Sequence, residues 1–158
     1  SKAYGAPGIR IGWIICRDRK LMHNFLAAKE QICLCNSVVD EEIAYGLVSH
    51  KTKWMLEHHA HIRKNFAYLK QWFNNQSFLE WVEPQAGVVC FPRFKEGISP
   101  DFNAFYDQLF RKYGTIVGPG HWFEQGKTYM RIGFGYPLED ELKVGLKNLE
   151  LCLADCRS

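Results

Sequence analysis

The chain has 158 residues, of which 47% are hydrophobic and 23% charged, and its net charge is +3. This balance is typical of a globular protein that can bury a sizeable core. The 20 basic and 17 acidic residues are spread along the chain, which argues against a nucleic-acid-binding tail or a membrane-surface patch. No apolar run approaches the roughly 20 residues of a transmembrane helix.

The six cysteines predict free thiols. They are too sparse for a small disulfide-stabilised scaffold, and most occupy apolar positions, which favours buried thiols in a reducing cytoplasm over disulfides. A metal site would need more ligands than Cys33-Leu34-Cys35 or the group His58, His59 and His61 supplies at zinc spacing. We therefore predict no metal.

The first half of the chain predicts one strand and two helices. Residues 9–16 are almost continuously apolar, as expected for a buried strand. Apolar residues at helical spacing predict a helix over residues 17–35. The same spacing continues from Val39 to Asn75 without a proline, which predicts one long helix of roughly 50 Å. A helix of this length suits a link between two domains.

The second half predicts a compact α+β unit. Two strands at 79–82 and 87–94 are expected to pair with each other. A helix should then begin with Ser99 as its N-cap and Pro100 at its first position, and end at Gly114.

Two short strands, 115–117 and 128–134, and a last amphipathic helix opened by Pro137 complete this unit. The helix is predicted to bury one leucine-rich face, formed by Leu138, Leu142, Leu146, Leu149 and Leu153.

A lysine in a glycine-rich turn opens the chain, and Arg10 follows at the entry to the predicted strand. An amine is a poor nucleophile at a pKa of ~10.4, and a nearby cation or burial lowers that pKa. Arg10 supplies a cation that could also hold a phosphate. Gly5 and Gly8 would let the backbone approach a bound group closely. Taken alone, Lys2 would be interpreted as a solvated terminal lysine.

The segment Thr128–Gly135 contains a second candidate site residue. Strand alternation places Met130, Ile132 and Phe134 on the core face and Arg131 on the opposite face. The planar guanidinium matches a carboxylate with two hydrogen bonds, which lysine cannot do. In an isolated strand, such an arginine would more often form a surface ion pair.

Four segments resemble, in order, motifs of the class I/II aminotransferases, enzymes of fold type I that use pyridoxal 5'-phosphate (PLP). Residues 1–12 resemble the cofactor-lysine segment, and residues 84–91 resemble a proline-then-glycine loop before a small-domain strand. Residues 113–123 resemble the family's Val-x-Pro-Gly-x-x-Phe segment. Residues 128–135 resemble the C-terminal stretch that carries the carboxylate-binding arginine. The resemblance covers essentially the whole chain.

The resemblance implies an α/β fold, of which this chain holds an α+β part. Residues 1–36 would be the end of the large PLP-binding domain, 37–76 the long linking helix, and 77–158 the small C-terminal domain. In the family, the aromatic residue that stacks on the cofactor, the aspartate on its ring nitrogen and most of the phosphate site precede the lysine. We therefore expect a C-terminal fragment that is inactive by itself.

The same resemblance assigns the site residues. Lys2 would be the catalytic residue and would bind the PLP aldehyde as a Schiff base, Arg10 and Ser1 would bind the cofactor, and Arg131 would bind the substrate carboxylate. The substrates would be an amino acid and a 2-oxo acid, and the full-length enzyme would be a cytoplasmic homodimer. Two alternatives remain open: a PLP-dependent β-lyase of the same fold, and a non-catalytic regulatory module.

Overall fold

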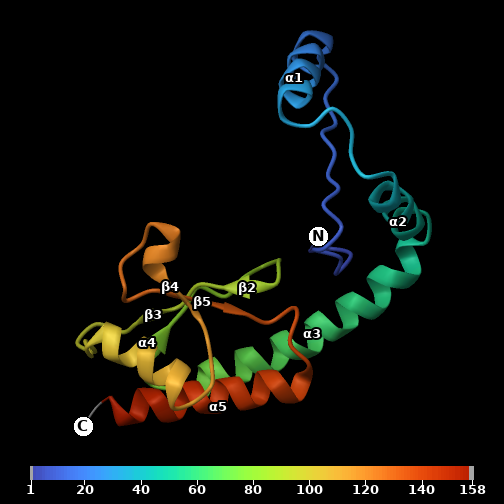
Figure 1. Cartoon of the computed structure of the whole chain (residues 1–158). Helices are drawn as coiled ribbons and strands as arrows, with labels where there is room; N and C mark the ends of the chain where they lie inside the picture. The colour runs from blue at the N-terminus through green and yellow to red at the C-terminus, as the bar shows by residue number, and fades with distance from the viewer. Residues whose placement is uncertain (1, 157–158) are drawn as a thin grey trace. The chain divides into compact units, whose positions relative to one another are not determined.

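The computed structural model describes residues 2–156, which form two compact units, one ending at His58 and the other beginning at His59 (Figure 1). The boundary falls inside helix α3 (Lys51–Asn75), so this helix contributes to both units.

In the first unit, the predicted helix is present as α1 (Arg19–Ile32). Asp18 begins it, because its carboxylate accepts the backbone N–H groups of Lys20 and Leu21, two of the donors that a helix start leaves unpaired. None of the residues of α1 is buried, so its apolar face is exposed.

The buried strand predicted over residues 9–16 is wrong. The segment belongs to no helix or sheet, and Trp13, Ile14 and Ile15 are 61%, 64% and 87% exposed. A strand requires a neighbouring strand for its backbone hydrogen bonds, and among residues 2–156 none lies beside this segment. Its residues Ile9, Ile11 and Trp13 instead line a cavity of ≈ 40 Å³ together with Ala44, Leu47 and Val48 of helix α2 (Val38–Ser49).

The single long helix predicted from residue 39 to residue 75 is also wrong, because it is divided into α2 (Val38–Ser49) and α3. At His50, between them, the backbone has φ −106° and ψ 26°, outside the helical region. The His50 ring Nδ1 lies 3.0 Å from the carbonyl oxygen of Gly46, the same oxygen that accepts the His50 backbone N–H. Gly46, in the last turn of α2, also lowers the helix propensity next to this break.

The second unit is an α+β domain, as predicted. Its strands and helices are β1 (Leu79–Glu80), β2 (Val89–Cys90), β3 (Arg93–Phe94), α4 (Phe102–Arg111), β4 (Gly118–Pro119), the 3-10 helix η1 (Gly120–Phe123), β5 (Met130–Gly133) and α5 (Glu139–Asp155). All strand pairs are antiparallel, in a two-stranded sheet β1-β3 and a three-stranded sheet β2-β5-β4.

This pairing corrects the predicted hairpin. The residues predicted as one strand, 87–94, form two short strands, of which only β3 pairs with β1. The other, β2, pairs with β5, a partner about 40 positions further along the chain. The strand predicted at 115–117 lies a few residues later, at β4.

The core of the second unit lies between the sheets and the helices. Figure 1 shows α5 running alongside the C-terminal half of α3, and Lys64 of α3 forms an ion pair with Glu139 at the start of α5. The buried apolar residues of the helices are Leu69, Trp72 and Phe73 of α3, Phe105 and Leu109 of α4, and Leu142, Leu146, Leu149, Cys152 and Leu153 of α5. Met130, Ile132 and Phe134 also lie in the core, as strand alternation predicted. The other buried apolar residues are Leu79, Cys90, Phe94 and Val117. Leu138 is an exception, at 66% exposed.

The N-cap of α4 is Asp101 and not Ser99. Its carboxylate accepts the N–H groups of Asn103 and Ala104, which a carboxylate does better than a hydroxyl because the hydrogen bond is charge-assisted. The helix ends before Gly114, which has φ +61°. This left-handed conformation favours glycine, as predicted for the helix stop.

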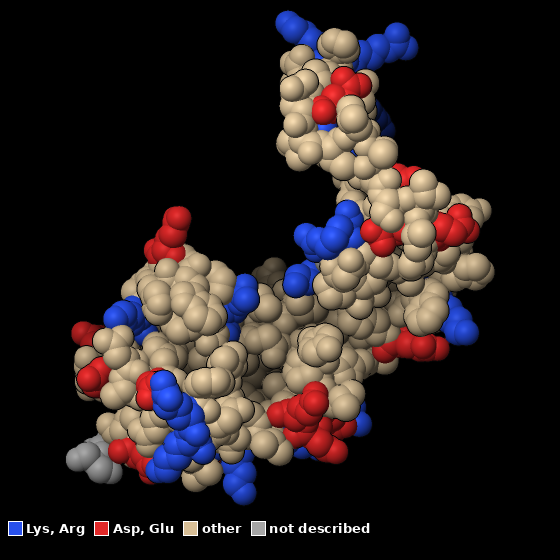
Figure 2. Space-filling model, in the orientation of Figure 1, with Lys and Arg blue, Asp and Glu red and all other residues tan. Residues whose placement is uncertain are grey.

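All six cysteines are free thiols, as predicted, but burial was predicted wrongly for some of them. Cys90 and Cys152 are buried, whereas Cys33 and Cys35 are exposed. Residues 2–156 contain no cluster of three or more potential metal ligands and no helix long and apolar enough to cross a membrane. Figure 2 shows acidic and basic side chains interspersed over the visible face.

Candidate functional site

Lys2 lies exposed in a tight turn. Its carbonyl oxygen accepts the Gly5 N–H at 3.3 Å, and Gly5 has φ +62°. The Nε2 of His58 lies 3.0 Å from the same carbonyl oxygen. A Cβ atom at Gly5 would lie 3.1 Å from His58 Cε1. The turn therefore needs glycine twice, for its backbone conformation and for the ring beside it.

Arg10 lies exposed on the same segment, and its Nη1 donates to the carbonyl oxygen of Pro7 at 3.0 Å. A guanidinium has several N–H donors, so this contact leaves others for an anion. The space around Gly8 is open, since a Cβ there would meet no atom within 4 Å. Ser1 lies outside the described residues.

The amine of Lys2 and the guanidinium of Arg10 are the groups in this segment that fit the two ends of PLP. An accessible amine suits the aldehyde, and a guanidinium with spare donors suits the phosphate. The glycine turn between them leaves room for the backbone to approach a ligand.

Arg131 lies on the face of the three-stranded sheet that is turned away from the core. It pairs across the ladder with Gly118 of β4, and its guanidinium carbon lies 4.2 Å from the centre of the Phe123 ring. A Cβ at Gly118 would lie 2.9 Å from Phe123 Cε2. Glycine at this position therefore lets the ring lie against Arg131, which is a favourable cation–π geometry.

Further aromatic rings continue from this contact. Phe91 meets Phe123 edge-on with ring centres 5.8 Å apart and stacks on Tyr129 at 5.6 Å. The nearby Arg93 forms an ion pair with Glu80. Within the described part of the chain, no carboxylate lies within ion-pair distance of Arg131. Its guanidinium is thus oriented by a ring and available to a carboxylate from outside.

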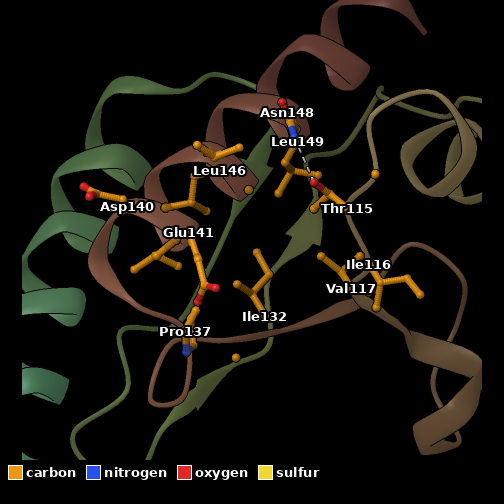
Figure 3. Close-up of a pocket in the computed structure, with 15 residues that line it drawn as sticks. Thr115, Ile116, Val117, Ile132, Pro137, Asp140, Glu141, Leu146, Asn148 and Leu149 are labelled. Carbon is orange, nitrogen blue, oxygen red and sulfur yellow. Dashed lines mark hydrogen bonds between the residues drawn. The ribbon is translucent and has the colours of Figure 1, made fainter.

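A cavity of ≈ 550 Å³ lies on the other side of the strand, between residues 114–117 and α5 (Figure 3). Asn148 closes one end by donating to Thr115 Oγ1 at 3.1 Å. Glu141 is engaged at the helix start, where it accepts the Leu138 N–H. Ile132 lines the cavity but Arg131 does not. The lining is mainly apolar, and among its described side chains there is no lysine, cysteine, serine or histidine.

The predicted site residues therefore form two separate groups. Lys2 and Arg10 belong to the first unit and Arg131 to the second.

Two further residues, His58 and Asn65, support the backbone beside Lys2 and after β5. His58 belongs to the helical spacing over residues 39–75 and was also considered as a potential metal ligand, but neither observation predicted its contact with Lys2. Asn65 of α3 is 0% exposed, and its Nδ2 donates to the carbonyl oxygens of Phe134 and Pro137 at 2.9 and 2.8 Å. It therefore fixes the chain where it leaves β5.

The sequence profile of the family described as "Aminotransferase class I and II" matches residues 1–149. The chain belongs to this family. It is 31% identical to capreomycidine synthase of Streptomyces vinaceus over 147 residues, which are 92% of this chain and 36% of the relative. It is 26% identical over 152 residues to aromatic-amino-acid aminotransferase 1 of Thermococcus litoralis, covering 91% of this chain and 35% of that protein.

The fold agrees with the sequence match. The crystal structure of a PLP-dependent aminotransferase from Streptococcus suis superposes with a TM-score of 0.87 and 25% identity, over 98% of this chain and 40% of that one. The family and this structural similarity imply PLP as the cofactor. The chain spans about a third of the length of the two curated relatives.

Proposed function

We propose that this chain acts as the C-terminal part of a PLP-dependent aminotransferase, which moves an amino group from an amino acid to a 2-oxo acid. The main support is the family match over residues 1–149, which includes both the Lys2 turn and Arg131. In this proposal, residues 1–36 end the large domain, 37–76 form the link and 77–158 form the small domain.

The site residues have different roles in this proposal. Lys2 would hold the cofactor through its amine, and Arg10 would hold the cofactor phosphate. Arg131, lying against Phe123, would bind the substrate α-carboxylate with two parallel hydrogen bonds. When bound, PLP supplies an electron sink that makes the α-proton of the amino acid acidic. Once the amine of the substrate has displaced Lys2 from the cofactor, the free Lys2 Nζ would accept that proton.

The test of Lys2 uses the longer polypeptide that carries this chain. Borohydride reduction followed by peptide mapping should place the pyridoxyl group on Lys2, and Lys2→Ala should abolish the labelling. Labelling of Lys20 or Lys29 in place of Lys2 would contradict the assignment. The 158-residue chain alone should bind PLP weakly, because in the family most cofactor contacts precede the lysine.

The test of Arg131 is the substitution by lysine, which keeps the charge but loses the planar pair of hydrogen bonds. A hydrogen bond to a charged group is worth about 1.5–3 kcal/mol, so kcat/KM should fall about ten- to a hundredfold. PLP content should not change. Arg10→Ala should show the reverse pattern, with weaker PLP retention as its main defect. If Arg131→Lys strips PLP or leaves turnover unchanged, this role is wrong.

A second candidate comes from the relative with 31% identity, whose name is a synthase and not an aminotransferase. A PLP-dependent lyase of the same fold would use the same lysine and arginine. Ping-pong exchange of amino groups supports the aminotransferase. Release of ammonia and pyruvate from β-substituted amino acids, without amino transfer, would support the lyase. Bound PLP without turnover of any amino acid would support a regulatory module.

We also propose a cytoplasmic homodimer. The six free thiols support a reducing compartment, and the exposed apolar residues of α1 support a further covered interface. Light scattering of the longer polypeptide would show the oligomeric state, and cell fractionation its location.

A further inference from the structure

We propose that His58 is a positioning residue for the cofactor lysine: its imidazole holds the Lys2 carbonyl group and braces the Gly5 turn. This inference rests on the role of Lys2 proposed above.

The first argument is the hydrogen bond between His58 and the backbone of Lys2. A carbonyl oxygen can only accept, so the His58 Nε2, at 3.0 Å, must carry the proton and donate it. The same oxygen accepts the Gly5 N–H that closes the turn. One atom of Lys2 therefore receives both contacts.

The second argument is the packing of the ring on Gly5. An added Cβ at Gly5 would lie 3.1 Å from Cε1 and 3.2 Å from Nδ1 of His58. The ring therefore covers the side of the turn that a larger residue would occupy. His58 contacts both ends of the turn, Lys2 and Gly5.

The third argument is the difference in stiffness between the two segments. Lys2 is exposed and belongs to no helix or sheet, so no ladder of backbone hydrogen bonds fixes its direction. His58 lies within a 25-residue helix, in which each turn is held by hydrogen bonds. A contact to α3 therefore gives the lysine turn a rigid support. A reacting group misplaced by about 1 Å can cost on the order of a hundredfold in rate.

Two substitutions separate the hydrogen bond from the ring packing. In the longer polypeptide, His58→Phe keeps a ring beside Gly5 but cannot donate to Lys2. His58→Gln can donate through its amide. We expect His58→Phe to lower kcat about ten- to a hundredfold, with KM for the amino acid within about twofold, and His58→Gln to recover most of the loss. His23→Phe, on exposed α1, is the matched control and should change neither.

A readout independent of turnover is hydrogen exchange of the Gly5 amide, which should quicken in His58→Phe and remain slow in His58→Gln. Gly5→Ala disturbs the same contact from the other side and should reproduce the loss if His58→Phe does not fold. The proposal would be overturned if His58→Phe kept the wild-type kcat and the wild-type exchange rate of the Gly5 amide. It would also be overturned if His58→Phe and His58→Gln lost the same amount of kcat. If the wild-type protein takes the pyridoxyl label elsewhere than Lys2, the proposed function fails and this role fails with it.

Discussion

Asn65 gives the sharpest test of how the second unit is held together. Its side chain is 0% exposed, and one amide nitrogen donates to two backbone carbonyl groups that lie 69 and 72 positions away in the sequence. Asn65→Asp keeps the size and shape of the side chain but replaces this donor by an acceptor. At neutral pH the carboxylate would face the carbonyl oxygens of Phe134 and Pro137.

The expected loss in the free energy of unfolding follows from the two hydrogen bonds of Asn65. The bond to Phe134 is buried and the bond to Pro137 is partly buried. A buried acceptor left unpaired costs about 1–3 kcal/mol, and a more accessible bond is worth about 0.5–1.5 kcal/mol. Asn65→Leu should therefore lower the free energy of unfolding by about 2–4 kcal/mol. Asn65→Asp should cost at least as much, because its buried carboxylate would face both carbonyl oxygens, with the His61 Nε2, 3.3 Å from the same position, as a neighbouring donor.

Urea unfolding of the chain, followed by tryptophan fluorescence, to which the core residue Trp72 contributes, measures this difference. Asn74→Leu, on the exposed side of the same helix, is the control and should stay within about 0.5 kcal/mol of wild type. The carboxyl group in Asn65→Asp should bind its proton more tightly in the folded state, so this variant should regain stability as the pH falls. If Asn65→Asp unfolds at the wild-type urea concentration, the two hydrogen bonds do not carry the stability assigned to them.

Three further predictions concern other parts of the chain. The lysines beside Glu139 lower its pKa from 4.5 to about 2; this stabilisation exists above the unfolded pKa and is lost as the pH falls through the folded one. Glu139→Gln should therefore lower the melting temperature at neutral pH, and the difference should vanish near pH 2, which thermal unfolding at several pH values would show. Burial raises the pKa of the Cys90 thiol to about 12, so iodoacetamide should label exposed Cys33 quickly and Cys90 only after unfolding; equal rates by mass spectrometry would contradict the structure. Gly118→Ala should displace the Phe123 ring, because the new Cβ would lie 2.9 Å from it, and an unchanged crystal position of that ring would refute this.

The elements that the sequence predicted well are those whose pattern is local. Helices α1 and α5 bury or expose side chains with a period set by the helix itself, so residue spacing is enough to find them. The alternation along β5 likewise placed Met130 and Ile132 in the core and Arg131 outside it. The order of the four motifs led to the aminotransferase family because it depends only on residue type and spacing.

The tertiary structure decided everything that needs a distant partner. The apolar run 9–16 has strand character, but no described residue pairs with it, so it forms no sheet. β2 joins β5 and not its near neighbour β1, because strand pairing is selected by packing over the whole core and not by proximity in sequence. The contact of His58 with Lys2 spans 56 positions, and that of Asn65 with Phe134 spans 69. A polar side chain shows no periodic signal for such a bond, since its partner is a backbone carbonyl that every residue carries.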